Sequence, residues 1–254
     1  MDRPVSVVIL AAGKGTRMKS DLPKVLHPIG NAPMIHHSLA SASALDPDRT
    51  VVVVGHGADE VIRSATQFVP GVRTAVQAEQ LGTGHAVSAA RAALAGFDGD
   101  LLVLFGDTPF LTAGTLWRIL AARRDADLVV LGFDAEEPGR YGRLVLAGDR
   151  LDAIVEAKDA TPEQLAITTC NSGVMAADCR TMLALLDRVS NENAQGEYYL
   201  TDIVGLARSD GLTARAVFCD EAETMGINDR VQLADAERIF QDRARRAAML
   251  GGAT

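Results

Sequence analysis

The chain has 254 residues, of which 48% are hydrophobic and 23% are charged, and its formal net charge is −8. A chain of this length can bury a large hydrophobic core, and the acidic excess disfavours a protein that binds nucleic acid or an anionic membrane through its charge. No apolar run approaches the ~18 residues of a membrane-spanning helix, so we expect a cytoplasmic globular protein with no membrane partner.

The three cysteines are Cys170, Cys179 and Cys219. Their odd number and the lack of a CxxC spacing indicate neither a disulfide framework nor a zinc cluster. We expect them to be buried and chemically inert thiols.

Short runs of β-branched residues alternate with helical patterns through the first half of the chain. Strands are expected at residues 5–10, 50–54, 73–77, 100–105 and 127–133, and helices from Pro33 and at residues 58–68, 84–94 and 112–124. Several strand runs are apolar on both faces, which is typical of parallel sheets covered by helices on both sides. The pattern predicts an α/β fold with a doubly wound, mostly parallel, Rossmann-like sheet.

After residue 136 the pattern changes to shorter units rich in glycine and aspartate. They predict a small inserted β-rich lobe over about residues 136–172, with a hairpin that turns at residues 147–150. Helices follow at residues 178–189 and 199–209, a strand at 213–218, and a helix that Asp229 caps and that runs towards Met249. We therefore expect one domain over residues 1–230, which carries the lobe, and a C-terminal helix over residues 231–254.

The strongest motif is the glycine-rich segment Leu10–Met18, directly after the first expected strand. Backbone N–H groups in such a loop face the crevice where phosphates bind, and Lys14, Arg17 and Lys24 supply positive charge. The segment lacks the P-loop pattern, and Met18 breaks GxGxxG, which disfavours dinucleotide binding. It therefore favours a loop that wraps a nucleoside triphosphate, with a bare turn between strand and helix as the alternative.

Two polar residues are candidates for binding at the same edge of the sheet. Asp107 follows the strand that ends at Phe105, and a carboxylate there suits Mg²⁺, which usually takes only one or two protein oxygens. A helix cap or a turn is the alternative role for Asp107. Gln77 can both donate and accept a hydrogen bond, which suits the N3–H and O4 groups of uracil.

Several motifs in the correct order resemble those of the sugar-nucleotide pyrophosphorylases, which join a nucleoside triphosphate to a sugar 1-phosphate and release pyrophosphate. The family signature is matched by LAAGKGTRM at residues 10–18 and DLPKVL at residues 21–26. Further motifs, QAEQLGTGHA at 77–86, GRYGR at 139–143, IVEAKDAT at 154–161 and NAQGEYYLTDI at 193–203, resemble the uridyltransferase domain of bacterial bifunctional enzymes. The resemblance runs from Val5 to about Glu237.

This resemblance implies an enzyme that makes UDP-N-acetylglucosamine, a precursor of peptidoglycan and lipopolysaccharide, from UTP and N-acetylglucosamine 1-phosphate with Mg²⁺. It implies catalytic roles for Arg17, Lys24 and Lys14, and metal ligands at Asp107 and Asn228. The nucleotide-binding residues it implies are Leu10, Ala11, Ala12, Gly13, Gln77, Gly82, Thr83, Phe105, Gly106 and Asp107. The sugar-binding residues it implies are Gly142, Glu156, Asn171, Thr201 and Asn228.

Two departures from the family pattern bear on selectivity. The sequence has FGD at residues 105–107 where YGD is usual, and TCNSG at residues 169–173 where an acidic residue usually comes first. The alternatives are the same chemistry with another nucleotide and sugar phosphate, a catalytically silent nucleotide-sugar-binding module and, more distantly, a dehydrogenase.

The related bifunctional enzymes continue into an acetyltransferase domain of hexapeptide repeats. No such repeats occur in these residues, so we expect neither acetyl transfer nor coenzyme A binding from them. The trimer that the repeat domain builds is not expected either, and the oligomeric state stays open.

Overall fold

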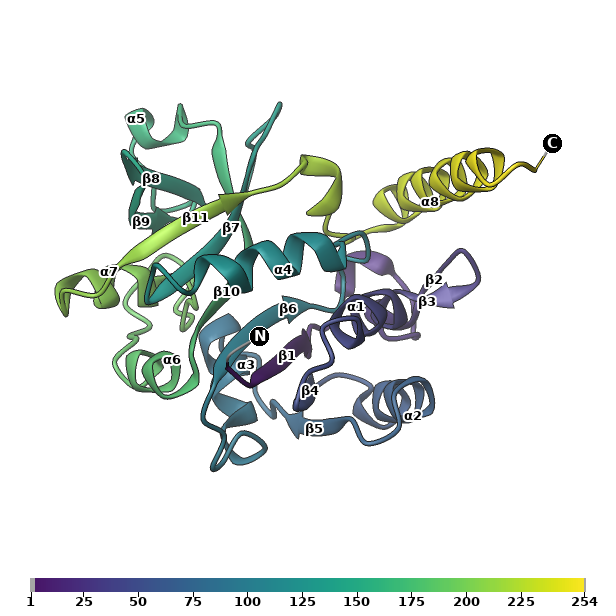
Figure 1. The fold of residues 1–254 in the computed structure, drawn as a ribbon, viewed down its shortest axis with the longest axis horizontal. Helices are drawn as coiled ribbons and strands as arrows, with labels where there is room; N and C mark the ends of the chain where they lie inside the picture. Colours follow the sequence, from purple (N-terminus) through teal and green to yellow (C-terminus); the bar gives the residue numbers. More distant parts are fainter. Residues whose placement is uncertain (1–2, 254) are drawn as a thin grey trace.

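The computed structural model describes residues 3–253, and a single large sheet organises them (Figure 1). Its strand order is β5-β4-β1-β6-β10-β7-β11-β9-β8. The strands are β1 (Val5–Ala11), β4 (Arg49–Val54), β5 (Arg73–Val76), β6 (Asp100–Phe105), β7 (Leu128–Asp134), β8 (Arg143–Ala147), β9 (Arg150–Val155), β10 (Thr169–Asp178) and β11 (Ala214–Phe218). A small separate sheet pairs β2 (Pro28–Ile29) with β3 (Ala32–Pro33).

Helices cover both faces of the sheet. They are α1 (Met34–Ser43), α2 (Ala58–Phe68), α3 (Thr83–Ala89), α4 (Ala113–Ala122), α5 (Pro162–Leu165), α6 (Cys179–Leu186), α7 (Asp202–Ser209) and α8 (Arg230–Leu250), with short 3₁₀ turns η1 (Thr16–Met18), η2 (Lys24–Leu26), η3 (Ala90–Ala92) and η4 (Glu221–Glu223). Val8 packs in the core under α3, α6 and α7, while Ile9 packs in the core under α1, α2 and α4. The expected doubly wound α/β fold is confirmed.

Most expected elements are present within one to three residues of their predicted ends, but β10 is not among them. It lies antiparallel between β6 and β7. Its register shifts between Asn171 and Met175, so the strand lacks the regular alternation by which strands are recognised. Strand β9 also runs against its neighbour β11, and the other seven strands share one direction, with parallel pairs running from β5 to β6 and joining β7 to β11.

The predicted hairpin consists of β8 and β9, which are paired from Arg143 with Val155 to Ala147 with Arg150. It continues the main sheet at one edge, because Arg150 pairs with Arg215 of β11 and Arg143 pairs with Cys170 of β10. The two ends of the hairpin that lie opposite its turn, near residues 142 and 156, are therefore beside β10, close to the bulge where its register shifts. The boundaries given for the lobe and for the C-terminal helix stay predictions.

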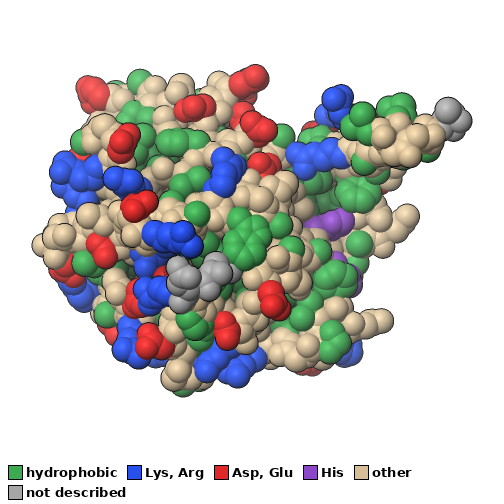
Figure 2. All heavy atoms as spheres, in the orientation of Figure 1, with side chains coloured by type: hydrophobic (Ala, Val, Ile, Leu, Met, Phe, Trp, Pro, Cys, Tyr) green, Lys and Arg blue, Asp and Glu red, His purple; other side chains and the backbone are tan. Residues whose placement is uncertain are grey.

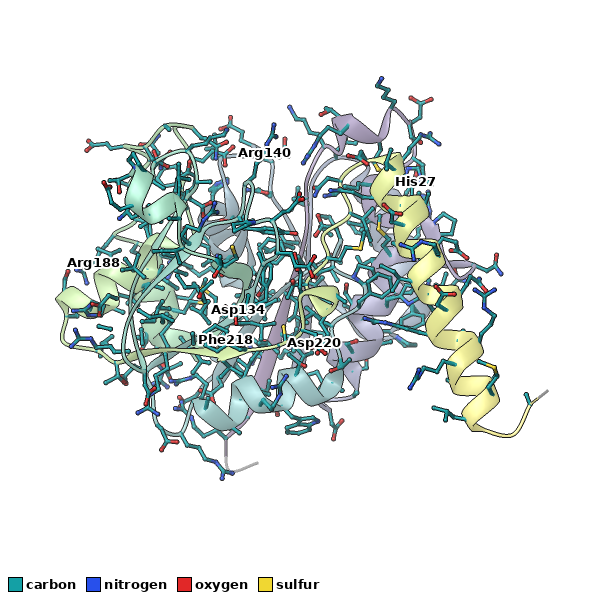
Figure 3. All side chains as sticks on the ribbon, turned by 90° about the horizontal axis from the view of Figure 1, so that it is seen from above. His27, Asp134, Arg140, Arg188, Phe218 and Asp220 are labelled. Carbon is teal, nitrogen blue, oxygen red and sulfur yellow. The ribbon has the colours of Figure 1, made fainter. Side chains whose placement is uncertain are left out.

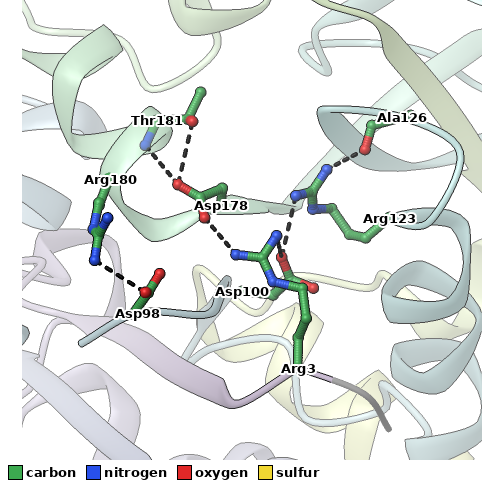
Figure 4. Close-up of polar contacts among 8 residues, drawn as sticks. All are labelled: Arg3, Asp98, Asp100, Arg123, Ala126, Asp178, Arg180 and Thr181. Carbon is green, nitrogen blue, oxygen red and sulfur yellow. Dashed lines mark hydrogen bonds and ion pairs between the residues drawn. The ribbon is translucent and has the colours of Figure 1, made fainter.

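Charged residues tie the chain together at the start of β1 and β6, away from the glycine-rich loop (Figure 4). Arg3 donates to Asp178 at 2.6 Å, and Arg123 pairs with Asp100 at 3.1 Å. Asp178 also accepts the N–H of Thr181 and so caps α6. These contacts join β1, β6, β10 and α4 at one end of the sheet.

Helix α8 begins where Asp229 accepts the N–H groups of Val231 and Gln232, as the sequence predicts. Its first half packs Ala236 and Phe240 near the β2–β3 hairpin, residues 241–250 are exposed, and its C-terminal end projects from the body (Figures 1 and 2). Within residues 3–253, no helix is both long and apolar enough to cross a membrane.

Two of the three thiols are buried as expected. Cys170 and Cys179 are buried, Cys219 is half-buried, and all three are free. Burial raises the pKa of each thiol, and beside Glu223 it raises the pKa of Cys219 to about 12.

Candidate active site

Two adjoining cavities open at the carboxyl ends of β1 and β6. The first, of about 240 Å³, is lined by Leu10, Ala11, Ala12, Gly13, Lys24, Val25, Gln77, Gln80, Gly82, Thr83, Ala86, Phe105, Asp107 and Glu197. The second, of about 940 Å³, is lined among others by Arg17, Glu156, Lys158 and Asn228. Phe105 and Asp107 line both, so a ligand in one cavity can touch a ligand in the other across these two residues. Open α/β sheets bind their ligands at this edge.

The glycine-rich loop follows β1 and closes over Lys24. Gly15 has φ +60°, and a Cβ there would lie 2.7 Å from the Lys24 Cβ, so only glycine lets the loop cross this lysine. A Cβ on Gly13 would meet no atom within 4 Å. The fold itself does not demand glycine at position 13, whereas a ligand that approaches the backbone would.

Lys24, Asp107 and Asn228 converge from three separate segments. The Lys24 ammonium forms an ion pair with the Asp107 carboxylate and lies 3.2 Å from the Asn228 amide oxygen. The N–H of Ile227 donates to the Asp107 carbonyl at 3.0 Å, which joins the two oxygen-bearing segments. The side-chain oxygens of Asp107 and Asn228 thus both contact a positive charge at the boundary between the cavities.

This donor set fits a hard divalent cation. Carboxylate and amide oxygens are ligands that Mg²⁺ accepts, and Mg²⁺ usually completes its shell with water and substrate phosphates. Among residues 3–253, no cluster of three or more His, Cys, Asp or Glu side chains could hold a metal by itself. A metal at Asp107 and Asn228 would therefore depend on a bound phosphate for further ligands.

Gln77 is buried at the inner end of the first cavity, with 4% of its surface exposed. Its amide nitrogen donates to the Gly82 carbonyl at 3.0 Å and lies 3.1 Å from His85 Nδ1. These contacts commit the nitrogen and leave the amide oxygen as an acceptor for a ligand N–H.

The segment from Leu81 to Gly84 is held against the loop that precedes α7. Tyr198 donates to the Leu81 carbonyl and accepts from the Gly84 N–H, both at 2.8 Å. Gly82 has φ +109°, and a Cβ there would lie 2.6 Å from the Tyr198 carbonyl oxygen, so the close approach requires glycine. The hydroxyl of Thr83 accepts from the Leu200 N–H at 3.1 Å. This wall of the cavity is therefore rigid.

Glu156 lies at the far side of the second cavity, at the end of the β8–β9 hairpin. The hydroxyl of Thr201 donates to it at 3.1 Å, and a Cβ on Gly142 would lie 3.5 Å from both of its oxygens. Burial raises the pKa of Glu156, and the neighbouring carboxylates of Asp202 and Asp159 raise it further. A carboxylate that accepts few hydrogen bonds from the protein can accept hydrogen bonds from ligand hydroxyls.

Asn171 faces the same end from the bulge of β10. Its backbone N–H donates to the Gly142 carbonyl at 2.8 Å, and its side-chain oxygen accepts from the Gly173 N–H at 2.9 Å. The oxygen is therefore committed to the bulge, and the amide NH₂ is the group left to donate to a ligand.

The structure brings most of the implied residues together. Gly106 lies beneath the first cavity, where a Cβ would be 3.2 Å from Val25. Lys14 is exposed on the glycine-rich loop and lines neither cavity, and Thr201 contributes through its bond to Glu156. Gly142 and Asn171 line neither cavity, although each is next in the chain to a residue that lines the second one, Tyr141 and Ser172 respectively. The other implied residues line a cavity.

Several lining residues are not among those implied by the sequence. Gln80 donates to the Gln77 carbonyl at 3.2 Å, and Lys158 contacts the Gln195 amide oxygen at the rim of the second cavity. Arg140 and Tyr141 line the same cavity, and Figure 3 shows Arg140 across from His27 and the first turns of α8. Their only sequence signal is membership of a motif: Gln80 belongs to QAEQLGTGHA, Lys158 to IVEAKDAT, and Arg140 and Tyr141 to GRYGR.

Comparison with known proteins agrees with this architecture. Residues 7–189 match the model of the MobA-like NTP transferase domain, which includes the glycine-rich loop, Gln77, Asp107 and Glu156 but ends before Asn228. The chain resembles a nucleoside-diphosphate-sugar pyrophosphorylase of Vibrio cholerae, with a TM-score of 0.74 at 18% identity over 92% of this chain and 99% of that one. It also resembles a UDP-glucose pyrophosphorylase complexed with UDP-glucose, with a TM-score of 0.71 at 16% identity over 94% of this chain and 99% of that one. These likenesses establish the fold.

Similar sequences are proteins named bifunctional protein GlmU. That of Ruegeria sp. (strain TM1040) is 59% identical over 240 residues, covering 94% of this chain and 54% of the relative. That of Cereibacter sphaeroides (strain ATCC 17023) is 57% identical over 255 residues, covering 100% of this chain and 56% of the relative. The chain thus spans about half the length of these relatives. With more than half of its residues matched by the family model, the chain belongs to the MobA-like NTP transferase domain family.

Proposed function

We propose that this protein transfers the uridylyl group of UTP to N-acetylglucosamine 1-phosphate, forming UDP-N-acetylglucosamine and pyrophosphate with the help of Mg²⁺. The observation that carries the proposal is the convergence of Lys24, Asp107 and Asn228 where the two cavities meet. One cavity holds the residues implied to bind the nucleotide, and the other borders the residues implied to bind the sugar. The reacting phosphates would then lie beside these three polar groups.

The first cavity suits the nucleotide. The Gln77 amide oxygen is left to accept the N3–H of uracil, and the backbone of the Gly82–Thr83 wall supplies further polar groups next to it. The triphosphate would lie along the glycine-rich loop, where Gly13 gives room and Arg17 lends charge. The distinction between uracil and cytosine would rest on Gln77, since cytosine lacks the N3–H donor.

The second cavity suits the sugar phosphate. Glu156 would accept hydrogen bonds from sugar hydroxyls, and the Asn171 NH₂ would donate to a hydroxyl or to the acetamido oxygen. Gly142 has no side chain beside the Glu156 carboxylate, and this would leave space for the N-acetyl group.

The reaction needs neither a general base nor a covalent intermediate, because the attacking sugar phosphate is already an anion. Its oxygen would form a bond to the α-phosphorus of UTP while the bond to the β-phosphate oxygen breaks in line, and pyrophosphate leaves. The barrier is the mutual repulsion of two polyanions and their orientation. Lys24 would bind the α-phosphate or the sugar phosphate, and Arg17 and Lys14 would stabilise the leaving pyrophosphate.

Asp107 and Asn228 would hold Mg²⁺, which would supply charge neutralisation at the reacting phosphates. The Lys24 ammonium contacts these same two oxygens, so it lies within reach of a phosphate bound beside them.

A substrate panel tests the proposal. Pyrophosphate release is measured with UTP, CTP, TTP and GTP against the 1-phosphates of N-acetylglucosamine, glucosamine and glucose, with Mg²⁺ and with EDTA. We expect turnover with UTP and the N-acetylated sugar and none with EDTA. Turnover only with another pair would retain the chemistry and overturn the substrate assignment, whereas silence with every pair would favour a binding module.

A further inference from the structure

Arg230, the first residue of α8, reaches across to the turn that follows the glycine-rich loop. Its Nε donates to the Met18 carbonyl at 2.8 Å, and a terminal nitrogen donates to the Lys19 carbonyl at 3.4 Å. The contact joins residues more than 200 positions apart, although part of the Arg230 side chain remains exposed.

The two carbonyls belong to a strained turn. The 3₁₀ turn η1 is followed by its cap residue Lys19, whose φ of 48° lies in the left-handed region that non-glycine residues rarely adopt. The last carbonyls of such a turn have no partner within it. A guanidinium presents its donors in a planar fork that matches two neighbouring oxygens, so Arg230 can hold both carbonyls at once.

The turn and the start of α8 each carry a residue of the candidate site. Arg17 lies within η1, and Asn228 lies two residues before Arg230. Both line the second cavity. The Asn228 N–H also donates to the Gln232 side chain at 2.7 Å, which fixes Asn228 to the first turn of α8. Arg230 is thus the hydrogen-bonded link between the segment of Arg17 and that of Asn228.

We propose that Arg230 is a positioning residue, which rests on the proposed function. It holds the η1 turn so that the Arg17 guanidinium faces the phosphates bound beside Asn228. It touches no substrate itself and acts through Arg17.

A double-mutant cycle of Arg230→Met and Arg17→Ala tests this route. We expect Arg230→Met to lower kcat/KM at least ~10-fold in the wild-type background, because small displacements of a charged group near the reacting atoms are costly. In the Arg17→Ala background the same change is expected to cost less than about twofold, because interacting residues do not act additively. Losses that multiply in the double variant would overturn the proposal.

Arg243→Met is the matched control. Arg243 lies on the same helix, also donates to a backbone carbonyl, that of Ala222 at 3.4 Å, and rests on the ring of Phe110 at 4.8 Å, away from both cavities. We expect kcat/KM to stay within about twofold of wild type in Arg243→Met. An equal loss in this variant would show that loosening α8 is sufficient, and would also overturn the proposal.

A second variant and a second measurement keep the test independent of whether Arg230→Met folds and of whether the wild type turns over substrate. Arg230→Lys keeps the charge but can reach only one carbonyl, so an intermediate loss is expected even if Arg230→Met does not fold. UTP affinity from isothermal titration should show the same dependence on Arg17. If the wild type turns over no substrate, the proposed function fails, and the Arg230 proposal is then decided by UTP binding: it fails if the two substitutions weaken that binding independently.

Discussion

Lys24 is the residue on which the site depends most directly, because its ammonium contacts both oxygens implied as metal ligands. We expect Lys24→Ala to lower kcat about 100-fold, in the range for losing one preorganised charge contact. The measurement is steady-state pyrophosphate release at saturating UTP and sugar phosphate. A drop of less than about fivefold would remove Lys24 from the catalytic residues.

Arg180→Ala serves as the control for that change. Arg180 also pairs with a carboxylate, that of Asp98 at 3.0 Å, but both lie on the surface near the start of β6 (Figure 4). Exposed ion pairs contribute little to stability, so the variant should retain wild-type kcat.

We expect the charged Glu156 carboxylate to lower the stability of the folded protein and to strengthen its binding of the sugar phosphate. Burial raises the pKa of Glu156, so above that raised value the charged carboxylate lowers the stability of the folded state by its full amount. Glu156→Gln removes this cost, and we expect a higher Tm than wild type at pH 7.5. The difference should shrink as the pH is lowered from the raised pKa towards the ordinary pKa of a glutamate carboxyl, because the unfolded state is then protonated as well.

Glu156→Gln should weaken the binding of the sugar phosphate and leave the binding of UTP unchanged. A charged acceptor makes stronger hydrogen bonds than an amide, so the KM for the sugar phosphate should rise about tenfold while the KM for UTP stays constant. Equal effects on both KM values would contradict the placement of Glu156 at the sugar end.

The residues that line the cavities were predictable where they belong to a contiguous motif. Gln77 and Asp107 stand at the ends of strands that apolar runs reveal, so their common edge follows from parallel topology. The Lys24 contact with Asn228 and the Arg230 contact with Met18 each join positions more than 200 residues apart. No local pattern encodes such contacts, because they depend on how α8 packs against the glycine-rich loop.

At the scale of elements, the wall formed by Leu81–Gly84 depends on one glycine. Gly82→Ala would place a methyl group 2.6 Å from the Tyr198 carbonyl at a φ of +109°. Backbone strain of this kind costs about 1–3 kcal/mol and must displace the wall from Gln77. We expect the KM for UTP to rise about tenfold with a smaller change for the sugar phosphate.

Gly96→Ala is the control for that strain. Gly96 also has a positive φ, of 72°, but a Cβ there would meet no atom within 4 Å, and it lies outside both cavities. It should lower stability without altering the KM for UTP. If Gly82→Ala left that KM unchanged, the wall would have no part in nucleotide binding.

The central strands and helices follow from the sequence because their burial is regular. Val51–Val54 is buried throughout, which indicates a strand covered on both sides. Strand β10 is different. Gly173 has φ +88° and lies against the Phe105 ring, and this bulge breaks the alternation that reveals a strand. Asn171, which the bulge follows directly, lies beside Gly142, so the element hardest to predict carries a residue of the proposed sugar site.

At the scale of the molecule, the three thiols report on global opening. Each has a raised pKa caused by burial, so thiolate is scarce at pH 8. We expect 5,5′-dithiobis(2-nitrobenzoic acid) to react slowly with the native protein at pH 8, and with three thiols after unfolding in guanidinium chloride. A thiol that reacts at the rate of free cysteine in the native protein would contradict the packing around β6, β10 and β11.

The proposed reaction is the transfer of the uridylyl group, with its α-phosphorus, between substrates in the two cavities. The most direct measurement is one incubation of the protein with UTP labelled at the α-phosphorus, N-acetylglucosamine 1-phosphate and Mg²⁺, followed by separation of the products. The account predicts that the label moves into UDP-N-acetylglucosamine, while the pyrophosphate released in equal amount carries none. Label that remains in UTP, or that appears as UMP without the sugar nucleotide, would contradict it.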